Sequence, residues 1–340
     1  MRKLSFAIIG CGQIARDRVI PAMLHAKRAN LVAIVDVDEK VVKHIARMYG
    51  ISHYYLNIEE LLDSDTVDAI YISTPNHLHS QYTIQAAEAG KHVLCEKPMA
   101  TTAEECKRMI ESIQRNKVKF MIAYMSRFNE ANIEAKRLIA EGIIGKPIFI
   151  KSQFAFVKTS GDDDWRLDPK RAGGGCLLDV GVYPIDAIEF IVKDQIVEVM
   201  AWKGNIRSNW EVEDIIIASF RLSQGAMGTF VCGYSINMPS TFEIYGTEGN
   251  IIVIKPFGQY ATSELELIRK NKRVKKELGL SDPNFACYQK EIEYFCECVE
   301  EDREPEANGE IGLYAARVVD AIYQSAITGR RIIVDPKAYL

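Results

Sequence analysis

The sequence predicts an α/β protein in which a doubly wound parallel sheet is followed by an α+β domain with a large open, mainly antiparallel sheet. Up to about residue 124, short runs rich in β-branched residues alternate with longer segments of helical periodicity. Beyond that point, short apolar runs follow one another and are separated by turn sequences such as Ser223-Gln224-Gly225, which is typical of hairpins. We therefore expect two domains, residues 1–124 and 125–340.

The first domain is expected to alternate strand and helix along its whole length. Its strands are predicted at residues 4–9, 31–35, 69–73, 92–95 and 119–123. Its helices are predicted at residues 14–27, 39–49, 80–89 and 103–116. Thr102 is a suitable N-cap for the last helix, with Glu105 three residues later. Regular alternation of this kind indicates a parallel sheet with helices on both faces.

The second domain combines helices at its ends with a series of strands. Helices are predicted at residues 130–141, 285–300 and 311–328, and strands at residues 148–156, 215–222, 225–234 and 241–245. A further helix opens at the three glycines of residues 173–175. Because one layer of helices covers only one face of a sheet, we expect the other face to meet a second subunit in a homodimer or homotetramer.

Composition excludes several classes of protein. The 340 residues are 48% hydrophobic and 26% charged, with a net charge of -4, so we expect neither disorder nor nucleic-acid binding. No apolar run is long enough to span a membrane, and eight scattered cysteines suit reduced thiols in the cytoplasm. All six histidines precede residue 93, so a site in the second half needs another acid or base. We expect no metal site.

A glycine-rich stretch follows the first predicted strand. Residues 10–15 read Gly-Cys-Gly-Gln-Ile-Ala, so Gly10, Gly12 and Ala15 form the spacing that lets a backbone approach a pyrophosphate at a helix N-terminus, with Gln13 and Ile14 between them. Asp36 ends the next strand, where a carboxylate accepts hydrogen bonds from the adenosine ribose and disfavours a 2′-phosphate. The sequence therefore predicts a dinucleotide cofactor, NAD in preference to NADP.

Glu96 and Lys97 end the strand predicted at residues 92–95, on the edge where open parallel sheets bind ligands. A lysine beside a cationic nicotinamide and away from water is suited to proton transfer. Pro98 stiffens the turn that follows, and the sequence leaves open whether its peptide bond is cis.

The stretch DVGVYPID, residues 179–186, places Asp179, Tyr183 and Asp186 at intervals of four and three, which is one face of a helix. Pro184 makes a kink or boundary expected nearby. With no histidine in this half, Tyr183 is the candidate proton donor and acceptor. A phenol ordinarily ionises near pH ~10, and a nearby ammonium such as that of Lys97 stabilises the phenolate.

These motifs together resemble the glucose-fructose oxidoreductase and inositol dehydrogenase family, Gfo/Idh/MocA. The resemblance rests on Gly10-x-Gly12-x-x-Ala15, STPNHLH at 73–79, EKP at 96–98, GGGCLLDVGVYPID at 173–186 and the C-terminal segment NGEIGLYAARVVDAIYQSAITGR. It implies hydride transfer between nicotinamide and a sugar or cyclic polyol hydroxyl. It also implies that Lys97 is the catalytic lysine and that Asp179 binds the reacting part of the substrate.

The resemblance further implies cofactor contacts at Thr74, Pro75, Asn76 and His79, near the nicotinamide ribose. Many family members have histidine at position 183, whereas this sequence has tyrosine, as in the subgroup of dihydrodiol and D-xylose dehydrogenases. An aldose is therefore the favoured substrate class.

Four further side chains are candidates for substrate binding. Trp165 and Arg166 precede the glycines, where they are suited to stack on a sugar and bind its hydroxyls. Tyr124 and Arg127 follow the last strand of the first domain. Two other functions stay open, an NAD-dependent glycoside hydrolase with transient oxidation and a non-enzymatic NAD-sensing regulator. The sequence does not distinguish the sugar or the direction of reaction.

Overall fold

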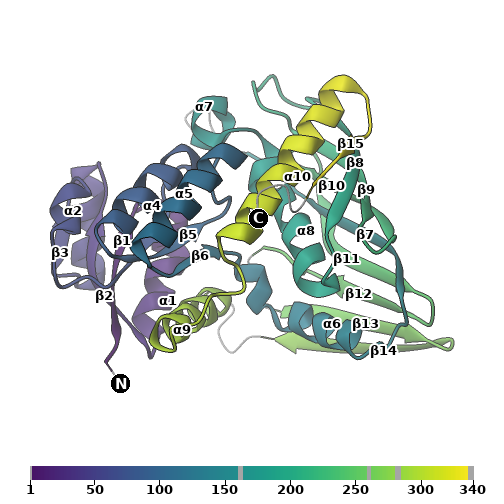
Figure 1. The fold of residues 1–340 in the computed structure, drawn as a ribbon, viewed down its shortest axis with the longest axis horizontal. Helices are drawn as coiled ribbons and strands as arrows, with labels where there is room; N and C mark the ends of the chain where they lie inside the picture. Colours follow the sequence, from purple (N-terminus) through teal and green to yellow (C-terminus); the bar gives the residue numbers. More distant parts are fainter. Residues whose placement is uncertain (1, 160–163, 259–261, 280–284, 336–340) are drawn as a thin grey trace. The chain divides into compact units, whose positions relative to one another are not determined.

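The structure is a computed structural model that describes residues 2–159, 164–258, 262–279 and 285–335. It contains two compact units, shown in Figure 1. The first unit comprises Met1–Met125 and Asn284–Leu313, and the second comprises Ser126–Pro283 and Tyr314–Leu340.

The sheet of the first unit is parallel, with the described strands in the order β3-β2-β1-β4-β5-β6. The chain order reverses between β1 and β4, and open α/β sheets bind ligands at the carboxyl ends of the strands beside such a point. The doubly wound prediction is confirmed. The strands are β1 Leu4–Ile9, β2 Ala29–Val35, β3 His53–Tyr55, β4 Ala69–Ile72, β5 His92–Glu96 and β6 Phe120–Ala123.

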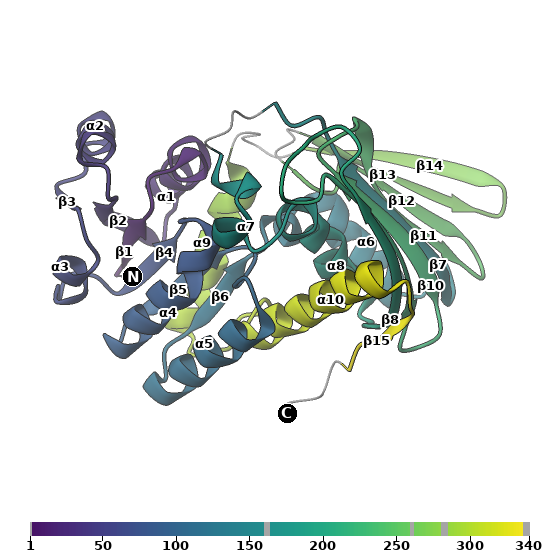
Figure 2. The same ribbon diagram turned by 90° about the horizontal axis from the view of Figure 1, so that it is seen from above.

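Helices cover both faces of this sheet, with α4 and α5 on one face and α1 and α9 on the other (Figure 2). The Thr102 hydroxyl accepts a hydrogen bond from Glu105 N at 3.2 Å, so the predicted cap of α5 is present. The short elements β3 and α3 escaped the sequence prediction because three or four residues show no clear period. The helical elements are η1 Ala15–Val19, α1 Ile20–His25, α2 Glu39–Tyr49, α3 Glu59–Leu62, η2 Asn76–Leu78, α4 His79–Glu88, α5 Ala103–Asn116 and α9 Ala286–Glu300.

Helix α9 belongs to the first unit although the sequence prediction placed residues 285–300 in the second domain. The helix packs against α1 and β2, and the ring of Phe295 lies 6.1 Å from that of Phe6 on β1. Both phenylalanines are completely buried. The helix returns to the first sheet because burying these aromatic rings stabilises it there.

The sheet of the second unit is mixed and mainly antiparallel. Its described strands run in the order β14-β13-β12-β11-β7-β10-β9-β8-β15, with β7 and β10 the parallel pair. This confirms the predicted large, mainly antiparallel sheet. The strands are β7 Pro147–Ala155, β8 Ile196–Gly204, β9 Ile215–Leu222, β10 Met227–Gly233, β11 Met238–Gly246, β12 Asn250–Ile254, β13 Thr262–Arg269, β14 Lys272–Gly279 and β15 Ile332–Ile333.

The longer helices of the second unit lie on one face of this sheet (Figure 2). Asn129 caps α6 by accepting a hydrogen bond from Ala131 N at 2.9 Å. The three glycines precede a continuous helical stretch made of η5, α8 and η6. The helical elements are η3 Met125–Phe128, α6 Glu130–Ala140, η4 Trp165–Leu167, α7 Pro169–Ala172, η5 Leu177–Gly181, α8 Val182–Ala187, η6 Ile188–Val192 and α10 Gly309–Thr328, the last contributing its residues from Tyr314 onward.

Side chains alternate between the two faces of the second sheet. On β9 the inward-facing Ile216, Ala218 and Phe220 are buried, whereas Ile217 between them is 41% exposed. The outward face also carries Trp202 on β8, which is 55% exposed, and Met227 on β10. The helix-free face of the described sheet, which was expected to meet a second subunit, thus carries large exposed apolar side chains.

All eight cysteines are buried free thiols. Within the described parts of the chain, no histidine, cysteine or carboxylate side chains gather in the groups of three that a metal ion requires. The described helices also include none with the length and apolar composition needed to cross a bilayer.

Candidate active site

The glycine-rich loop connects β1 to η1 at the carboxyl edge of the first sheet, and its two glycines serve different purposes. Gly10 has φ +91°, and a Cβ there would lie 2.7 Å from the carbonyl oxygen of Ser73. Only glycine fits this close backbone approach. At Gly12 a Cβ would meet nothing within 4 Å, so the space beside this backbone is open to a ligand. Gln13 and Ile14 follow Gly12, and the buried Ala15 packs at the start of η1.

Asp36 connects this loop to the end of β2. Its Oδ2 accepts a hydrogen bond from Cys11 N at 2.7 Å, and its Oδ1 accepts one from Asp38 N at 2.9 Å. Asp36 therefore orders the glycine loop. Since each carboxylate oxygen has two lone pairs, both oxygens keep acceptor capacity for ribose hydroxyls.

The segment after β4 carries the predicted contacts at Thr74, Pro75 and Asn76. The Thr74 hydroxyl is buried and makes no hydrogen bond within the described residues. A buried hydroxyl without a partner is costly, so this atom is suited to a bound polar ligand. Pro75 is half-buried and Asn76 is buried at the start of η2.

His79, the fourth predicted contact, is completely buried. Its Nδ1 is 2.8 Å from the carbonyl oxygen of Pro98, and its Nε2 is 2.9 Å from that of Thr74. Burial lowers the pKa of this imidazole, and the ammonium of Lys97 lowers it further. The hydrogen bonds to the two carbonyl groups raise the pKa, but the net shift is downward. His79 thus joins the Thr74 segment to the turn after β5 and supports the site without an exposed surface of its own.

Glu96 and Lys97 stand at the carboxyl end of β5, both half-buried. Glu96 Oε1 accepts a hydrogen bond from the Tyr71 hydroxyl at 3.0 Å, which fixes the glutamate against the sheet. The Lys97–Pro98 peptide bond is cis. The carboxyl edge of the first unit's sheet therefore holds the glycine loop after β1, Asp36 after β2 and Lys97 after β5.

In the second unit, Asp179 on η5 is held by two side chains from other elements. Its Oδ2 accepts a hydrogen bond from the Tyr234 hydroxyl at 2.7 Å, and its Oδ1 lies 3.9 Å from Arg166 Nε. Burial and the Asp179 carboxylate raise the pKa of Tyr234 well above the ordinary phenol value. Burial alone would lower the pKa of Arg166, but the carboxylates of Asp179 and Asp164 raise it. Asp179 is therefore held in position as a hydrogen-bond acceptor.

Tyr183 follows Asp179 by one helical turn, on α8. Its ring makes an edge contact with Phe154 at 5.7 Å and stacks near Phe257 at 5.9 Å. The side chain is 8% exposed, so the ring is fixed in place by aromatic packing. The structure thus places Asp179 and Tyr183 on one helical stretch of the second unit.

Glu213 holds the beginning of this helical stretch, and the sequence analysis missed it. The buried carboxylate accepts hydrogen bonds from Gly175 N at 3.0 Å, from Leu177 N at 3.0 Å and from the Tyr323 hydroxyl at 2.9 Å. A carboxylate at a helix N-terminus satisfies free N–H groups and is favoured by the helix dipole. A Cβ on Gly175 would lie 2.2 Å from the carbonyl oxygen of Glu213, so this glycine allows the approach.

Tyr234 was also missed by the sequence analysis. It directly follows β10 on the inward face shared by Phe230 and Cys232, a pattern that predicts burial but not a partner. The hydrogen bond to Asp179 joins residues far apart in the chain, which periodicity does not reveal.

Two predicted substrate-binding residues, Tyr124 and Arg127, are buried in the structure. Arg127 is 5% exposed and forms a buried ion cluster, with Nε 2.9 Å from Asp186 Oδ1 and NH2 2.6 Å from Glu189 Oε2. Burial raises the pKa of Asp186 to about 6, and Arg127 opposes that shift. Tyr124 is 1% exposed and leaves no surface for a substrate.

Trp165 and Arg166 lie on η4, where Arg166 Nε is 3.9 Å from Asp179 Oδ1. The Arg166 guanidinium stacks over the Trp165 ring at 4.4 Å, and Asp164 lies 3.6 Å from its NH1. Both side chains are half-buried, so they keep polar and apolar surface that a sugar can contact.

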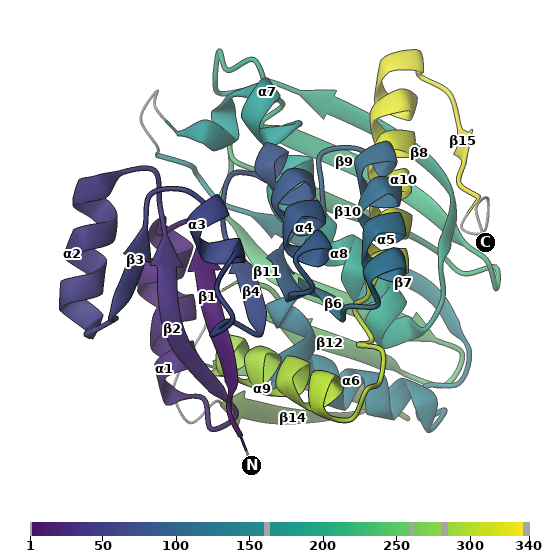
Figure 3. The same ribbon diagram turned by 60° about the vertical axis from the view of Figure 1, so that its left-hand side comes forward.

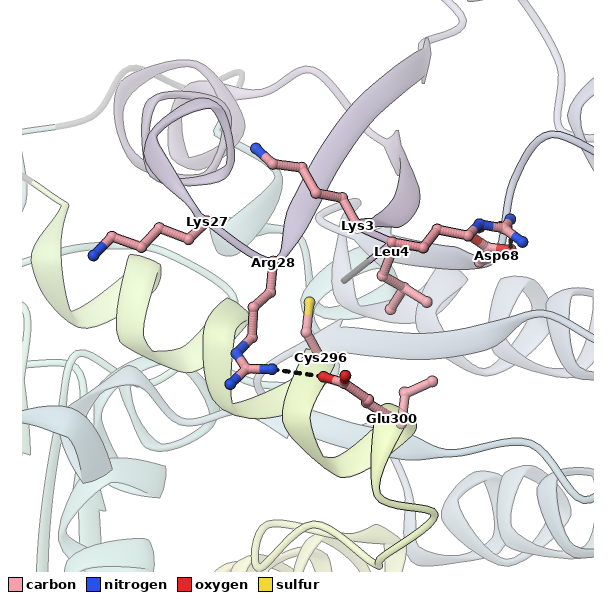
Figure 4. A pocket seen from close by; sticks show the side chains of 9 residues that line it. Lys3, Leu4, Lys27, Arg28, Asp68, Cys296 and Glu300 are labelled. Atoms are coloured by element: carbon pink, nitrogen blue, oxygen red, sulfur yellow. Dashed lines mark hydrogen bonds and ion pairs between the residues drawn. The ribbon is translucent and has the colours of Figure 1, made fainter.

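A pocket of about 530 Å³ in the first unit lies at the opposite edge of its sheet. Figure 4 shows the Arg28 side chain pointing toward Glu300, with Cys296 beside them, while Lys3 at the start of β1 points away. Arg28 forms an ion pair with Glu300 at 2.6 Å, and Arg2 forms one with Asp68 at 2.9 Å. Because ligands of such sheets bind at the carboxyl ends of the strands, this pocket is not the candidate active site.

Two family models match consecutive parts of the chain. An oxidoreductase family with an NAD-binding Rossmann fold matches residues 4–124, and the GFO/IDH/MocA C-terminal domain matches residues 133–252. The chain belongs to the GFO/IDH/MocA oxidoreductase family. The resemblance seen in the sequence motifs is thereby confirmed.

Several relatives of this GFO/IDH/MocA protein are named for sugar substrates. It is 30% identical to the D-xylose 1-dehydrogenase (NADP(+)) of Haloarcula marismortui, covering 97% of this chain and 93% of the relative. It is 31% identical to the 1,5-anhydro-D-fructose reductase of Ensifer adhaerens, covering 97% and 98%. The crystal structure of the aldose-aldose oxidoreductase from Caulobacter crescentus complexed with glycerol superimposes with a TM-score of 0.92 at 32% identity, covering 98% of this chain and all of the other.

Proposed function

We propose that this protein is an NAD-dependent oxidoreductase that transfers a hydride between nicotinamide and a CHOH group of an aldose or a related cyclic polyol. The observation that carries the proposal is the carboxylate of Asp179, held between Tyr234 and Arg166 on the helical stretch that also bears Tyr183. A carboxylate that only capped a helix would not need a buried phenol and a guanidinium from two other elements.

The residues at the carboxyl edge of the first sheet fit a dinucleotide. The space beside Gly12 accommodates a pyrophosphate, and the unpartnered Thr74 hydroxyl is available to a polar group. Asp36 is placed to accept hydrogen bonds from ribose hydroxyls, and its charge opposes a 2′-phosphate. When bound, nicotinamide supplies the site that accepts or releases hydride.

The chain's own side chains provide for the proton and for substrate orientation. Asp179 accepts a hydrogen bond from a substrate hydroxyl and fixes its direction, because Tyr234 prevents the carboxylate from turning. Tyr183 and Lys97 are the candidates to take the hydroxyl proton as hydride leaves. Trp165 and Arg166 bind the rest of the sugar.

The first test of this function follows NADH absorbance with a panel of aldoses, inositols and dihydrodiols. Lys97→Ala and Tyr183→Phe are each expected to lower kcat by about 10² or more, the usual contribution of a positioned acid or base. Lys91→Ala serves as the lysine control, because Lys91 directly precedes β5 and so lies at the opposite end of this strand from Lys97. Full activity of Lys97→Ala would overturn its assignment.

Cofactor preference requires its own experiment, because relatives include an NADP-dependent dehydrogenase. We expect NAD to bind more tightly than NADP. Asp36→Ala should weaken NAD binding and so reduce the difference in affinity between the two cofactors. Isothermal titration with both cofactors measures this. Tighter binding of NADP by the unchanged protein would contradict the proposed role of Asp36.

The helix-free face of the second sheet supports a proposal about assembly. Trp202, Ile217 and Met227 are exposed there on three neighbouring strands, β8, β9 and β10. We propose that this face binds a second copy of the chain in a homodimer or homotetramer. Light scattering at micromolar concentration is expected to report an oligomer, and Trp202→Glu to shift it toward a monomer.

Release of p-nitrophenol from p-nitrophenyl glycosides, without net NADH, would instead favour the hydrolase reaction. Cofactor binding without turnover of any sugar or glycoside would favour a sensor. Both outcomes are read in the same set of assays.

A further inference from the structure

A second pocket, of about 280 Å³, lies wholly within the second unit and adjoins the Asp179 site through Tyr234. Its wall includes the side chains of Lys158, Arg207, Trp210 and Tyr234. Pockets for organic ligands start at about 300 Å³ and combine aromatic walls with a few polar groups. This pocket lies just below that range, so its size and composition suit one small polar ring and no larger ligand.

Tyr234 connects this pocket to the candidate substrate site. Its ring belongs to the pocket wall, while its hydroxyl donates to Asp179 at 2.7 Å. Lys158 lies on the same ring, with Nζ 4.9 Å from its centre, and pairs with Asp164 at 2.9 Å. Since Asp164 precedes the Trp165–Arg166 pair beside Asp179, the pocket and the Asp179 site have walls in common.

Hydrogen bonds order the loop between β8 and β9, which carries Trp210. Asp214 accepts hydrogen bonds from the backbone N–H groups of Ile206, Arg207 and Ser208, at 2.9 to 3.1 Å. Burial would raise the pKa of Asp214, but these N–H groups lower it, so the carboxylate stays ionised. The side chain of Asn205 also donates to the carbonyl oxygen of Trp210 at 2.5 Å.

Trp210 combines a fixed position with a remaining exposed surface. Its ring meets Tyr234 edge-on, with centroids 6.3 Å apart and planes at 76°. The side chain is half-buried, and the loop around it contains Arg207, whose exposed guanidinium lines the same pocket. A monosaccharide bound at Asp179 does not explain an aromatic side chain held beyond Tyr234.

We propose that this pocket binds a second sugar ring, so that the substrate is a disaccharide or glycoside whose other ring is the one oxidised beside Asp179. A sugar presents a face of C–H groups, which packs on an indole, and an edge of hydroxyl oxygens, which accept from Arg207 and Lys158. The inference rests on the proposed sugar oxidoreductase function and specifies its substrate class.

The kinetic test compares D-xylose with xylobiose and D-glucose with cellobiose, using the full chain and its cofactor. The unchanged protein is expected to have a kcat/KM about tenfold higher for the disaccharides, mainly through KM. In Trp210→Ala, kcat/KM for disaccharides is expected to fall about tenfold more than kcat/KM for monosaccharides. Removing a well-packed tryptophan from a binding site has effects of this order. Trp210→Phe should recover part of the difference.

Ile206→Ala is the matched control, since Ile206 is 78% exposed in the same loop and does not line the pocket. It should behave as the unchanged protein does. Equal kcat/KM for monosaccharides and disaccharides, or equal losses for both in Trp210→Ala, would overturn the second sugar position.

Calorimetric titration of xylobiose and cellobiose separates this inference from the proposed function. If no sugar reduces the cofactor but the disaccharides bind and Trp210→Ala binds about tenfold more weakly, the oxidoreductase proposal fails and the second sugar position stands. If disaccharides bind no better than monosaccharides, the second sugar position is wrong whatever the catalytic result.

Discussion

Replacing Tyr234 by Phe removes one hydroxyl and keeps the aromatic ring, so it tests the support of Asp179 directly. The Tyr234 hydroxyl donates to Asp179 Oδ2 at 2.7 Å, a charge-assisted hydrogen bond. Hydrogen bonds to charged groups contribute about 1.5–3 kcal/mol. If the bond is made at full strength only in the transition state, its loss lowers kcat/KM by about 10- to 100-fold, because 1.36 kcal/mol is one factor of ten.

Protein stability should respond less than activity to this change. The Asp179 side chain is 20% exposed, so water can replace part of the lost hydrogen bond, and we expect the free energy of unfolding to fall by about 1 kcal/mol. The assay is steady-state NADH formation with an aldose, beside urea unfolding of the same preparations.

Tyr314→Phe is the control for losing a buried phenol. The Tyr314 hydroxyl accepts from Ile196 N at 2.7 Å in the second unit, and neither residue touches Asp179. This variant should lose stability without a comparable loss of kcat/KM. The reasoning is refuted if Tyr234→Phe keeps the original kcat/KM, or if its activity falls only as far as that of Tyr314→Phe.

Three further predictions concern glycines and an acid. Gly175→Ala should lower the free energy of unfolding by at least about 2 kcal/mol in urea titrations, because its Cβ would lie 2.2 Å from the Glu213 carbonyl oxygen; unchanged stability would contradict the close packing. Gly12→Ala should leave unfolding unchanged, since its Cβ meets nothing within 4 Å, yet weaken NAD binding about tenfold or more in calorimetry; equal affinity would place the pyrophosphate elsewhere. Hydrogen bonds from Arg137 lower the pKa of Glu134 to about 2. Ionised Glu134 therefore stabilises the folded protein fully above the pKa of the unfolded chain, about 4.3, and this stabilisation is lost as the pH falls from there toward 2. With solvent screening allowed for, Glu134→Gln should remove about 1 kcal/mol of this pH-dependent free energy of unfolding. An acid unfolding curve identical to that of the unchanged protein would contradict this role of Glu134.

The two sheets were predictable because their patterns are local. Strand and helix periods alternate through the first unit, and the inward residues of β9 and β10 recur at every second position. The glycine loop was predictable for the same reason, since a strand, a tight turn and a helix follow one another directly. Gly10 stands at a positive φ that few other residues adopt.

The supporting residues of the site could not be predicted because their partners are distant in sequence. Glu213 caps a helix that begins well before it in the chain, and Tyr234 reaches back to Asp179 from the end of a strand. Arg127 was misread for a related reason, since an arginine after a strand suits a ligand and a buried carboxylate equally. Only the fold decides between them.

The return of α9 to the first unit affects how the protein can be synthesised and divided. All strands of the first sheet leave the ribosome before the chain of the second sheet is made, whereas Phe295, which packs against Phe6, follows that sheet. The nascent first unit must therefore keep the face around Phe6 and α1 exposed until the later helix arrives. A fragment ending at residue 124 would expose the same apolar face permanently, so we expect it to aggregate unless residues 284–313 are supplied with it.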